Sequence, residues 1–122
     1  MRANMSDLDF TIYCTVTFFS KKMVNSPNLT NGKYSPQIVL KGIEEHLEVN
    51  FIDGEDVIFD QPIRANALPI NEDVDYSSLQ EGTEFLIMEG SNIVGEGIVK
   101  EIFQHKPHER KNFRVLYPLV VL

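Results

Sequence analysis

The sequence predicts an all-β protein, a small barrel built from six short strands. Between positions 10 and 19 an apolar residue recurs at every second position, which is the two-residue period of a half-buried strand. The other short apolar runs are separated by turn residues, and no long amphipathic helix interrupts them. Residues 83–99 read as a hairpin whose returning strand carries Gly95 and Gly97 on one face. Missing side chains let the backbone bend sharply or another segment approach closely, as happens where a small barrel closes.

The first strand is the most regular element of the sequence. The residues expected to face the core are Phe10, Ile12, Cys14, Val16 and Phe18. Their β-branched and aromatic side chains fit a pleated surface that is buried on one side. Tyr13 and Phe19 on the opposite side indicate that part of the outer face is covered as well.

Turn residues mark the limits of the remaining strands. We expect strands at 37–41, 47–52 and 63–68, a brief ladder at 57–59, and the hairpin at 83–99, which continues to Phe103. The hairpin turn is Gly90-Ser91-Asn92, because these residues tolerate left-handed backbone geometry.

Two local details of this stretch can also be predicted. Within the hairpin, Ile93 is expected on the same face as Gly95 and Gly97. Residues 76–80 are expected to form one helical turn that Asp75 caps and Gly82 ends.

Length and composition indicate one globular domain. The 122 residues are fewer than the roughly 150 that one domain typically contains, with the barrel at 9–103 and a C-terminal extension at 104–122 that we expect to add a strand. Hydrophobic residues make up 43% and charged residues 24%, which favours neither disorder nor a membrane protein. No apolar run is long enough to span a bilayer, and residues 1–9 lack the apolar core of a signal peptide. We therefore expect a cytoplasmic protein, and the single Cys14 agrees with a reducing compartment.

The charge balance limits the kinds of partner. Eighteen acidic and eleven basic residues give a formal charge of −7. Such a charge repels a phosphate backbone unless the basic residues cluster, so nucleic acid is a disfavoured partner. It would speed the encounter with a basic protein.

Two stretches resemble a known family of barrels. Met88-Glu89-Gly90-Ser91-Asn92-Ile93-Val94-Gly95-Glu96-Gly97-Ile98-Val99 is similar to the Arg-Glu-Gly-Gly-Arg-Thr-Val-Gly-x-Gly-Val-Val segment that closes the C-terminal barrel of elongation factor Tu. Tyr34-Ser35-Pro36-Gln37-Ile38 resembles the Tyr-Arg-Pro-Gln-Phe of the same domain. The resemblance covers residues 9–103 and implies a closed six-stranded Greek-key barrel, here as a stand-alone domain.

The resemblance implies contacts with macromolecules, and the sequence departs from it at informative positions. In elongation factor Tu this barrel contributes to binding the T stem of aminoacyl-tRNA and packs on other protein domains. Three of the family's arginines are replaced here, by Ser35, Met88 and Asn92. The loss of these cations removes contacts that would hold phosphates, so tRNA binding is an alternative and not the first expectation. The chain also lacks the phosphate-binding Gly-x-x-x-x-Gly-Lys-Ser/Thr motif, so we expect no GTP hydrolysis.

No motif for catalysis, a metal or a cofactor is apparent. The segment 105–109 holds two histidines and a glutamate, but Pro107 prevents a helix from aligning them, so a solvated turn is expected. The acidic segments 53–56 and 72–75 lack the twelve-residue spacing of a calcium loop and read as turns. Cys14 lies in mid-strand without an activating neighbour. We expect no enzyme, although a site assembled from distant residues stays open as a third class.

The leading interpretation is a non-enzymatic binding module that acts through protein–protein contacts, for example a small acidic inhibitor or immunity-type protein. The alternative is an RNA-binding accessory domain of translation that recognises tRNA. The extension would cover a face of its own barrel, pair with a second copy in a homodimer or pair with a different protein, because exposed apolar edges invite strand addition. The candidate partner-binding residues are Tyr34, Gln37, Glu89, Gly90, Asn92, Phe113 and Tyr117.

Overall fold

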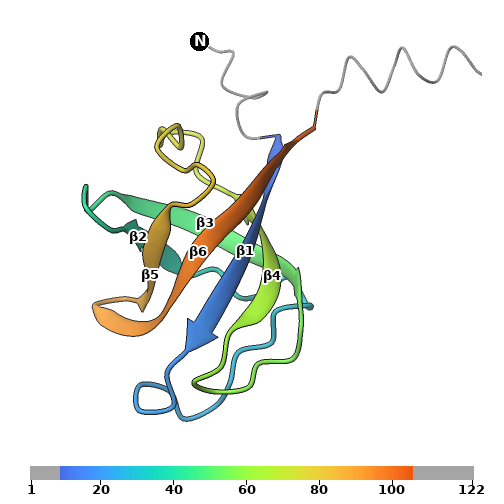
Figure 1. Cartoon of the computed structure of the whole chain (residues 1–122), viewed down its shortest axis with the longest axis vertical. Coiled ribbons are helices and arrows are strands. Elements are labelled where there is room, and N and C mark those ends of the chain that lie inside the picture. The colour runs from blue at the N-terminus through green and yellow to red at the C-terminus, as the bar shows by residue number, and fades with distance from the viewer. Residues whose placement is uncertain (1–8, 106–122) are drawn as a thin grey trace, which may run out of the picture.

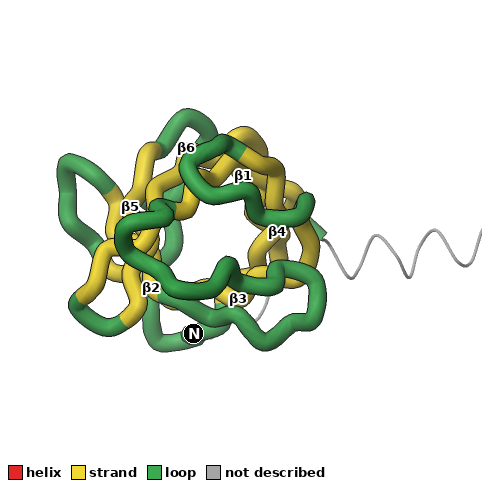
Figure 2. The backbone as a smooth tube through the Cα atoms, turned by 90° about the horizontal axis from the view of Figure 1, so that it is seen from below, coloured by secondary structure: helices red, strands yellow, loops and turns green. Residues whose placement is uncertain are grey.

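The computed structural model of the chain describes residues 9–105, which form a closed barrel of six strands (Figure 1). The strands are β1 (Phe10–Phe18), β2 (Gln37–Leu40), β3 (His46–Gly54), β4 (Ile63–Pro69), β5 (Glu84–Glu89) and β6 (Asn92–Gln104). Their order around the barrel is β1-β4-β3-β2-β5-β6, and every neighbouring pair is antiparallel. Figure 2 views the molecule from below and shows the strands arranged as a ring. The predicted all-β fold with a closed six-stranded barrel is confirmed.

The connections give the barrel its Greek-key arrangement. Strands β2, β3 and β4 follow one another as antiparallel neighbours, whereas β1 lies on the far side of β4. A long connection over residues 19–36 therefore crosses one end of the barrel between β1 and β2. We call this end, where β1 stops and the β5–β6 turn lies, the lower end, as in Figure 1. The opposite end, where β1 begins and β6 stops, is the upper end.

The interior is filled by the residues that the alternation predicts. All five inward positions of β1 are buried, with exposures between 0% and 6%. Larger side chains from the other strands complete the core, among them Phe51, Phe85 and Ile87. In the described part of the chain the core contains no buried polar or charged residue. Burial of apolar surface is therefore the main stabilising term of the barrel.

Gly95 and Gly97 lie where β6 passes closest to its two neighbours. A Cβ atom at Gly95 would lie 2.5 Å from the Thr17 carbonyl oxygen of β1. A Cβ atom at Gly97 would lie 2.6 Å from Cζ of Phe85 on β5 and 2.8 Å from the Thr15 carbonyl oxygen. The predicted close approach at these glycines is confirmed, and it involves both strands that flank β6.

The expectation for Ile93 is wrong. A bulge shifts the β5–β6 register between Ile87 and Met88, so that Met88 pairs with Ile93 while Ile87 pairs with Gly95. Val94 is the extra residue, and it is fully buried, whereas Ile93 is 36% exposed. The extra residue reverses the alternation, so Ile93 no longer lies on the face of the two glycines.

Two further expectations fail in loops. Residues 57–59 form no ladder, because Asp60 has a left-handed φ of 67° and its amide donates to the Phe18 carbonyl oxygen at 2.7 Å. This contact leads the segment across the lower end, where Val57 and Phe59 pack on the core from outside the sheet. Residues 76–80 form turns and no helix. Asp75 does accept the predicted bond from the Ser77 amide at 2.9 Å, but the turn that follows, in which the Leu79 amide donates to the Tyr76 carbonyl oxygen at 2.9 Å, is not helical.

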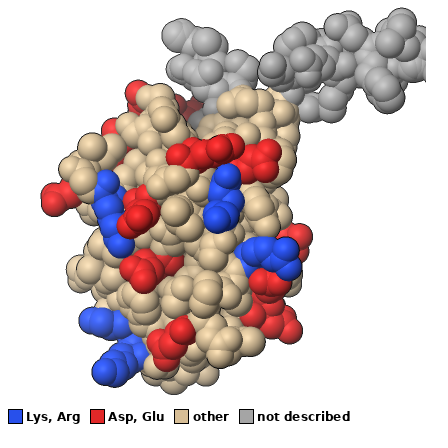
Figure 3. All heavy atoms as spheres, viewed as in Figure 1, with Lys and Arg blue, Asp and Glu red and all other residues tan. Residues whose placement is uncertain are grey.

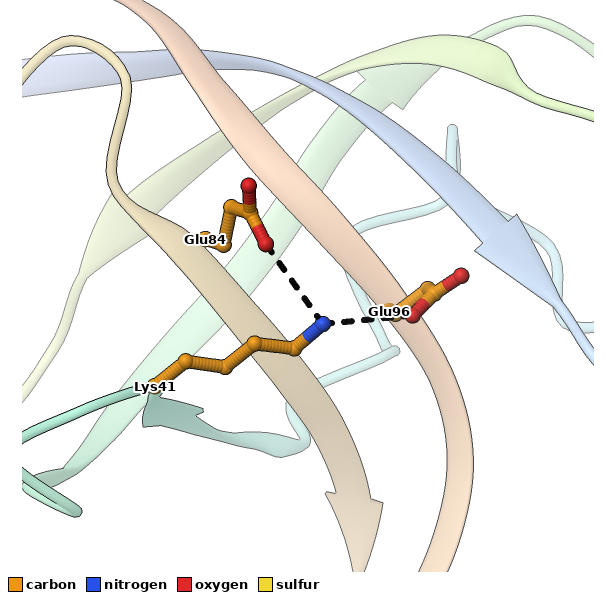
Figure 4. A network of polar contacts seen from close by, with 3 residues as sticks. All are labelled: Lys41, Glu84 and Glu96. Carbon is orange, nitrogen blue, oxygen red and sulfur yellow. Dashed lines mark hydrogen bonds and ion pairs between the residues drawn. The ribbon is translucent and has the colours of Figure 1, made fainter.

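The outer face carries a small ionic network across the closing strands (Figure 4). Nζ of Lys41, just after β2, lies 3.6 Å from Oε1 of Glu84 on β5 and 3.4 Å from Oε1 of Glu96 on β6. All three side chains are well exposed, so solvent screens the attraction and its contribution to stability is small.

We expect Gly97→Val to destabilise the barrel by about 1–3 kcal/mol, because the added side chain overpacks against Phe85 and the β1 backbone. Urea denaturation followed by circular dichroism measures the free energy of unfolding. In the Gly97→Val variant, a second substitution, Phe85→Leu, should recover part of the lost stability, since the shorter side chain frees space next to position 97. The control Lys100→Ala, at an exposed position of the same strand, should change stability by less than about 0.5 kcal/mol. Equal stabilities for Gly97→Val and the control would contradict the close-approach explanation.

Candidate functional site

The lower end of the barrel holds the described candidate residues, and Tyr34 lies at their centre. Outside the named strands, Tyr34 forms a single bridge to β3, in which the Phe51 amide donates to its carbonyl oxygen at 2.9 Å. Its ring stacks on Phe51, with centroids 5.8 Å apart, and meets the edge of Phe18 at 5.9 Å. Two core aromatic side chains therefore fix the position of this loop residue.

The hydroxyl of Tyr34 links the loop to the β5–β6 hairpin. It donates a hydrogen bond to Oε2 of Glu89 at 2.7 Å. Burial of the phenol, followed by the hydrogen bond and negative charge of Glu89, raises the pKa of Tyr34 well above its ordinary value. The phenol therefore stays a neutral donor, and it orients the glutamate at the surface of the lower end.

A shallow depression of about 510 Å³ lies around this pair. We call its lining the hairpin-end surface, and its residues are Tyr34, Ser35, Pro36, Gln37, Met88, Glu89 and Gly90. Gln37 enters through β2, where it pairs with Met88 of β5, and its Oε1 lies 3.3 Å from Nδ1 of His46. The two sequence stretches that carry the family resemblance, about 50 residues apart, thus meet on one surface.

Asn92 joins the hairpin to the long loop on the other side of the turn. It pairs with Glu89 in the ladder, and its Nδ2 donates to the Lys22 carbonyl oxygen at 3.2 Å. Apolar side chains next to this contact are open to solvent, with Ile93 36% and Val24 94% exposed. Five of the predicted residues therefore lie at one end of the barrel. The other two, Phe113 and Tyr117, lie outside the described residues.

Sequence reasoning missed Tyr76, which closes the upper end. Its ring is 6% exposed and meets the edge of Phe10, with centroids 6.2 Å apart. Its hydroxyl donates to the Glu48 carbonyl oxygen of β3 and accepts the amides of Ile70 and Asn71 at 3.3 and 3.2 Å. The sequence signal that could have indicated this capping role is that Tyr76 is the single tyrosine in an acidic, turn-rich stretch.

The described residues offer little for covalent or metal chemistry. The Cys14 thiol is buried, and burial raises its pKa to about 12, so the reactive thiolate is disfavoured. Residues 9–105 contain no group of three or more His, Cys, Asp and Glu side chains placed to hold a metal ion. His105 joins the upper ends of the first and last strands, with Nδ1 3.2 Å from Oδ1 of Asp9 and Nε2 3.0 Å from Oγ1 of Thr11. The rest of the 105–109 segment lies outside the described residues.

The acidic segment 72–75 begins with the expected turn, but the expectation for 53–56 is wrong, because Asp53 and Gly54 are the last residues of β3 and pair with Asn66 and Ala65 of β4. Asp53 accepts the Gly54 amide at 2.9 Å, and Glu55 pairs with Arg64 at 3.0 Å across the end of the β3–β4 hairpin. Hydrogen bonds from the Arg64 amide and guanidinium lower the pKa of Glu55.

Between residues 9 and 105 the chain has no helix that is long and apolar enough to cross a membrane.

The Tyr34–Glu89 bond predicts a difference between wild type and Tyr34→Phe in alkaline solution. Because folding raises the pKa of Tyr34, its contribution to stability is complete below the ordinary tyrosine value of about 10 and is lost as pH rises toward the folded value. Wild type should therefore lose stability more steeply above that pH than Tyr34→Phe, and Glu89→Gln should fall between them. Urea denaturation over a pH series measures this. Parallel curves for wild type and Tyr34→Phe would contradict it.

Comparison with known proteins leaves the family open. No protein-family model matches the chain, and no curated protein matches its sequence. The similarity to the elongation factor Tu barrel therefore stays a prediction that the fold alone does not decide.

Proposed function

We propose that this chain is a non-enzymatic binding module that acts through protein–protein contacts at its lower end. The observation that carries the proposal is the convergence of Tyr34, Gln37, Glu89 and Gly90 on the hairpin-end surface. These residues come from a loop, β2 and the β5–β6 turn, and the hydrogen bond from Tyr34 to Glu89 links the loop to the hairpin.

The chemistry of this surface suits a protein partner. Tyr34 is pinned by two rings and orients Glu89, so both present polar groups at a low cost in conformational entropy. The exposed Val24 and Ile93 beside the turn add apolar area. A rigid tyrosine with apolar neighbours is a composition that protein interfaces favour at their core, and the oriented Glu89 carboxylate adds a charge that suits a basic partner.

The charge of the barrel favours a basic partner. Residues 9–105 contain sixteen acidic and six basic side chains, a formal charge of −10. A field of this sign steers a basic protein toward the barrel and speeds association at low salt. A small acidic inhibitor or immunity-type protein is the concrete form of this proposal.

A stand-alone relative of the elongation factor Tu barrel fits the same proposal. The two stretches that resemble that domain form most of the hairpin-end surface, and the closed six-stranded barrel agrees with it. In a free-standing barrel, the surface that packs on neighbouring domains in the translation factor becomes available to another protein.

The proposal predicts protein binding that depends on Glu89. In nuclease-treated cell extract, wild type and Glu81→Lys should retain the same protein, whereas Glu89→Lys and Gln37→Ala should lose it. The control Glu81→Lys makes the same charge change at an exposed position near the upper end. Calorimetry with the purified partner should then show at least tenfold weaker binding for Glu89→Lys. A set of retained proteins that is identical for all four chains would overturn the proposal.

One observation favours the alternative, an RNA-binding role. Of the six basic residues in the described range, Lys21, Lys22 and Lys33 are exposed on the single loop that borders the hairpin-end surface. Such a cluster could contact phosphates although the whole barrel is acidic.

Fluorescence anisotropy with labelled bulk tRNA distinguishes the two functions. The protein-binding proposal predicts no saturable binding of tRNA even at low salt. The alternative predicts binding that weakens steeply as salt rises and is lost in Lys21→Glu/Lys22→Glu, because both lysines would release counterions on binding. Binding that this double variant removes would replace the leading proposal with the alternative.

A further inference from the structure

The upper end of the barrel contains a hollow of about 720 Å³ that is larger than the depression at the lower end. Its floor is apolar and consists of Phe10 from β1, Ile102 from β6, and Val74, Tyr76 and Leu79 from the 70–83 loop. Val74 and Ile102 are only partly buried, so the floor is open to a further apolar side chain. We call this feature the upper hollow.

The rim of the upper hollow is acidic. Glu72, Asp73 and Asp75 line it, and none of its lining residues is basic. Asp75 is bonded to the Ser77 amide, whereas Glu72 and Asp73 are exposed and form no ion pair among residues 9–105. Figure 3 shows acidic side chains gathered across the upper part of the face in view. A basic segment with apolar side chains would complement this hollow in charge and in polarity.

The sequence holds such a segment directly after the described residues. Residues 106–117 contain four basic residues and one acidic residue, a formal charge of +3. Phe113, Val115 and Tyr117 alternate within it. Its charge is thus opposite in sign to the −10 of the barrel, and its apolar residues have the spacing of a strand.

The segment also starts in the right place. Gln104, the last residue of β6, lines the upper hollow, and the His105 amide fixes the chain there by donating to the Asp9 carbonyl oxygen at 2.7 Å. The eight residues from 106 to Phe113 reach about 26 Å when extended, enough to turn back across a hollow that begins at Gln104. Tethering makes the contact intramolecular and so raises its effective concentration.

The upper part of β6 offers a backbone edge for the same segment. The β5–β6 ladder ends at the pair of Glu84 and Ile98, but β6 continues to Gln104 with β1 as its ladder partner. Ile102 and Gln104 lie on this stretch and also line the upper hollow. A chain that crosses the hollow can therefore add main-chain hydrogen bonds to β6.

We propose that residues 106–117 dock into the upper hollow of their own barrel, with the basic side chains on the acidic rim and Phe113 or Tyr117 on the apolar floor. The contact lies at the end that Tyr76 closes, opposite the end that Tyr34 and the long loop close. It uses a different surface from the proposed partner site, so either proposal can fail without the other.

A spin label on the full chain tests the docking. Asn112→Cys provides the labelling position, because the buried Cys14 resists modification. In amide NMR spectra of the labelled chain, Val74, Tyr76 and Ile102 should lose most of their intensity, whereas Gly54 and Gly90 at the lower end should keep theirs. An unchanged pattern of peak positions shows that the labelled chain is folded. Uniform or absent losses would overturn the proposal, whether the hollow is empty or another molecule fills it.

Two comparisons distinguish the remaining occupants. A mixture of isotope-labelled wild type with spin-labelled, unenriched protein reports contacts between copies, and losses at Val74 and Ile102 in that mixture as large as those within one chain would assign the hollow to a second copy. Asp73→Lys should abolish most of the intramolecular effect, whereas Asp56→Lys, the same change at an exposed site near the lower end, should retain it. Equal effects of the two variants would contradict charge recognition at the rim.

Discussion

The close passage of β6 between β1 and β5 is the constraint on which the barrel depends. A cylinder of six strands closes only if the strand that completes the ring can bend while it pairs with both of its neighbours. In β6 this bend is allowed by Gly95, Gly97 and the bulge at Val94. A side chain at either glycine would meet the β1 backbone, which cannot move aside without breaking the ladder. In the closed barrel, each of the six strands is hydrogen-bonded to a neighbour along both of its edges. Recognition by the described residues is therefore directed to its two ends and its outer face.

The two ends are closed by tyrosines in different ways. Tyr34 sends its hydroxyl outward to the exposed Glu89, so closing the lower end also builds a polar surface there. Tyr76 sends its hydroxyl to the β3 backbone and the adjoining loop, so its polar group is used inside the structure. The lower end thus presents orienting polar groups, whereas the upper end presents an apolar floor with a charged rim. This difference is why the proposed partner site and the proposed docking site lie at opposite ends.

Much of the fold could be predicted because side-chain alternation reports burial directly. The buried face of β1 and the close approach at Gly97 follow from local patterns of two or three residues. The burial of Val94 in place of Ile93 could not be predicted, because a bulge depends on the register of a neighbouring strand. The predicted ladder at 57–59 was wrong for a related reason, since the path of this loop is set by the contact of Asp60 with Phe18, about 40 residues away. Gln37 and Glu89 were identified as candidates through the resemblance, but that they share one surface with Tyr34 is a property of the barrel.

The distribution of charge connects both proposals. The formal charge of −7 is a balance between a barrel of −10 and a segment of +3, so the net value understates the field around the barrel. If the segment occupies the upper hollow, it offsets part of the negative charge of the acidic rim there. The barrel keeps a net negative charge, so a basic partner is still attracted to it. Because the screening length is about 8 Å at physiological salt, this steering acts mainly at close range, where Glu89 and Tyr34 decide the final contact.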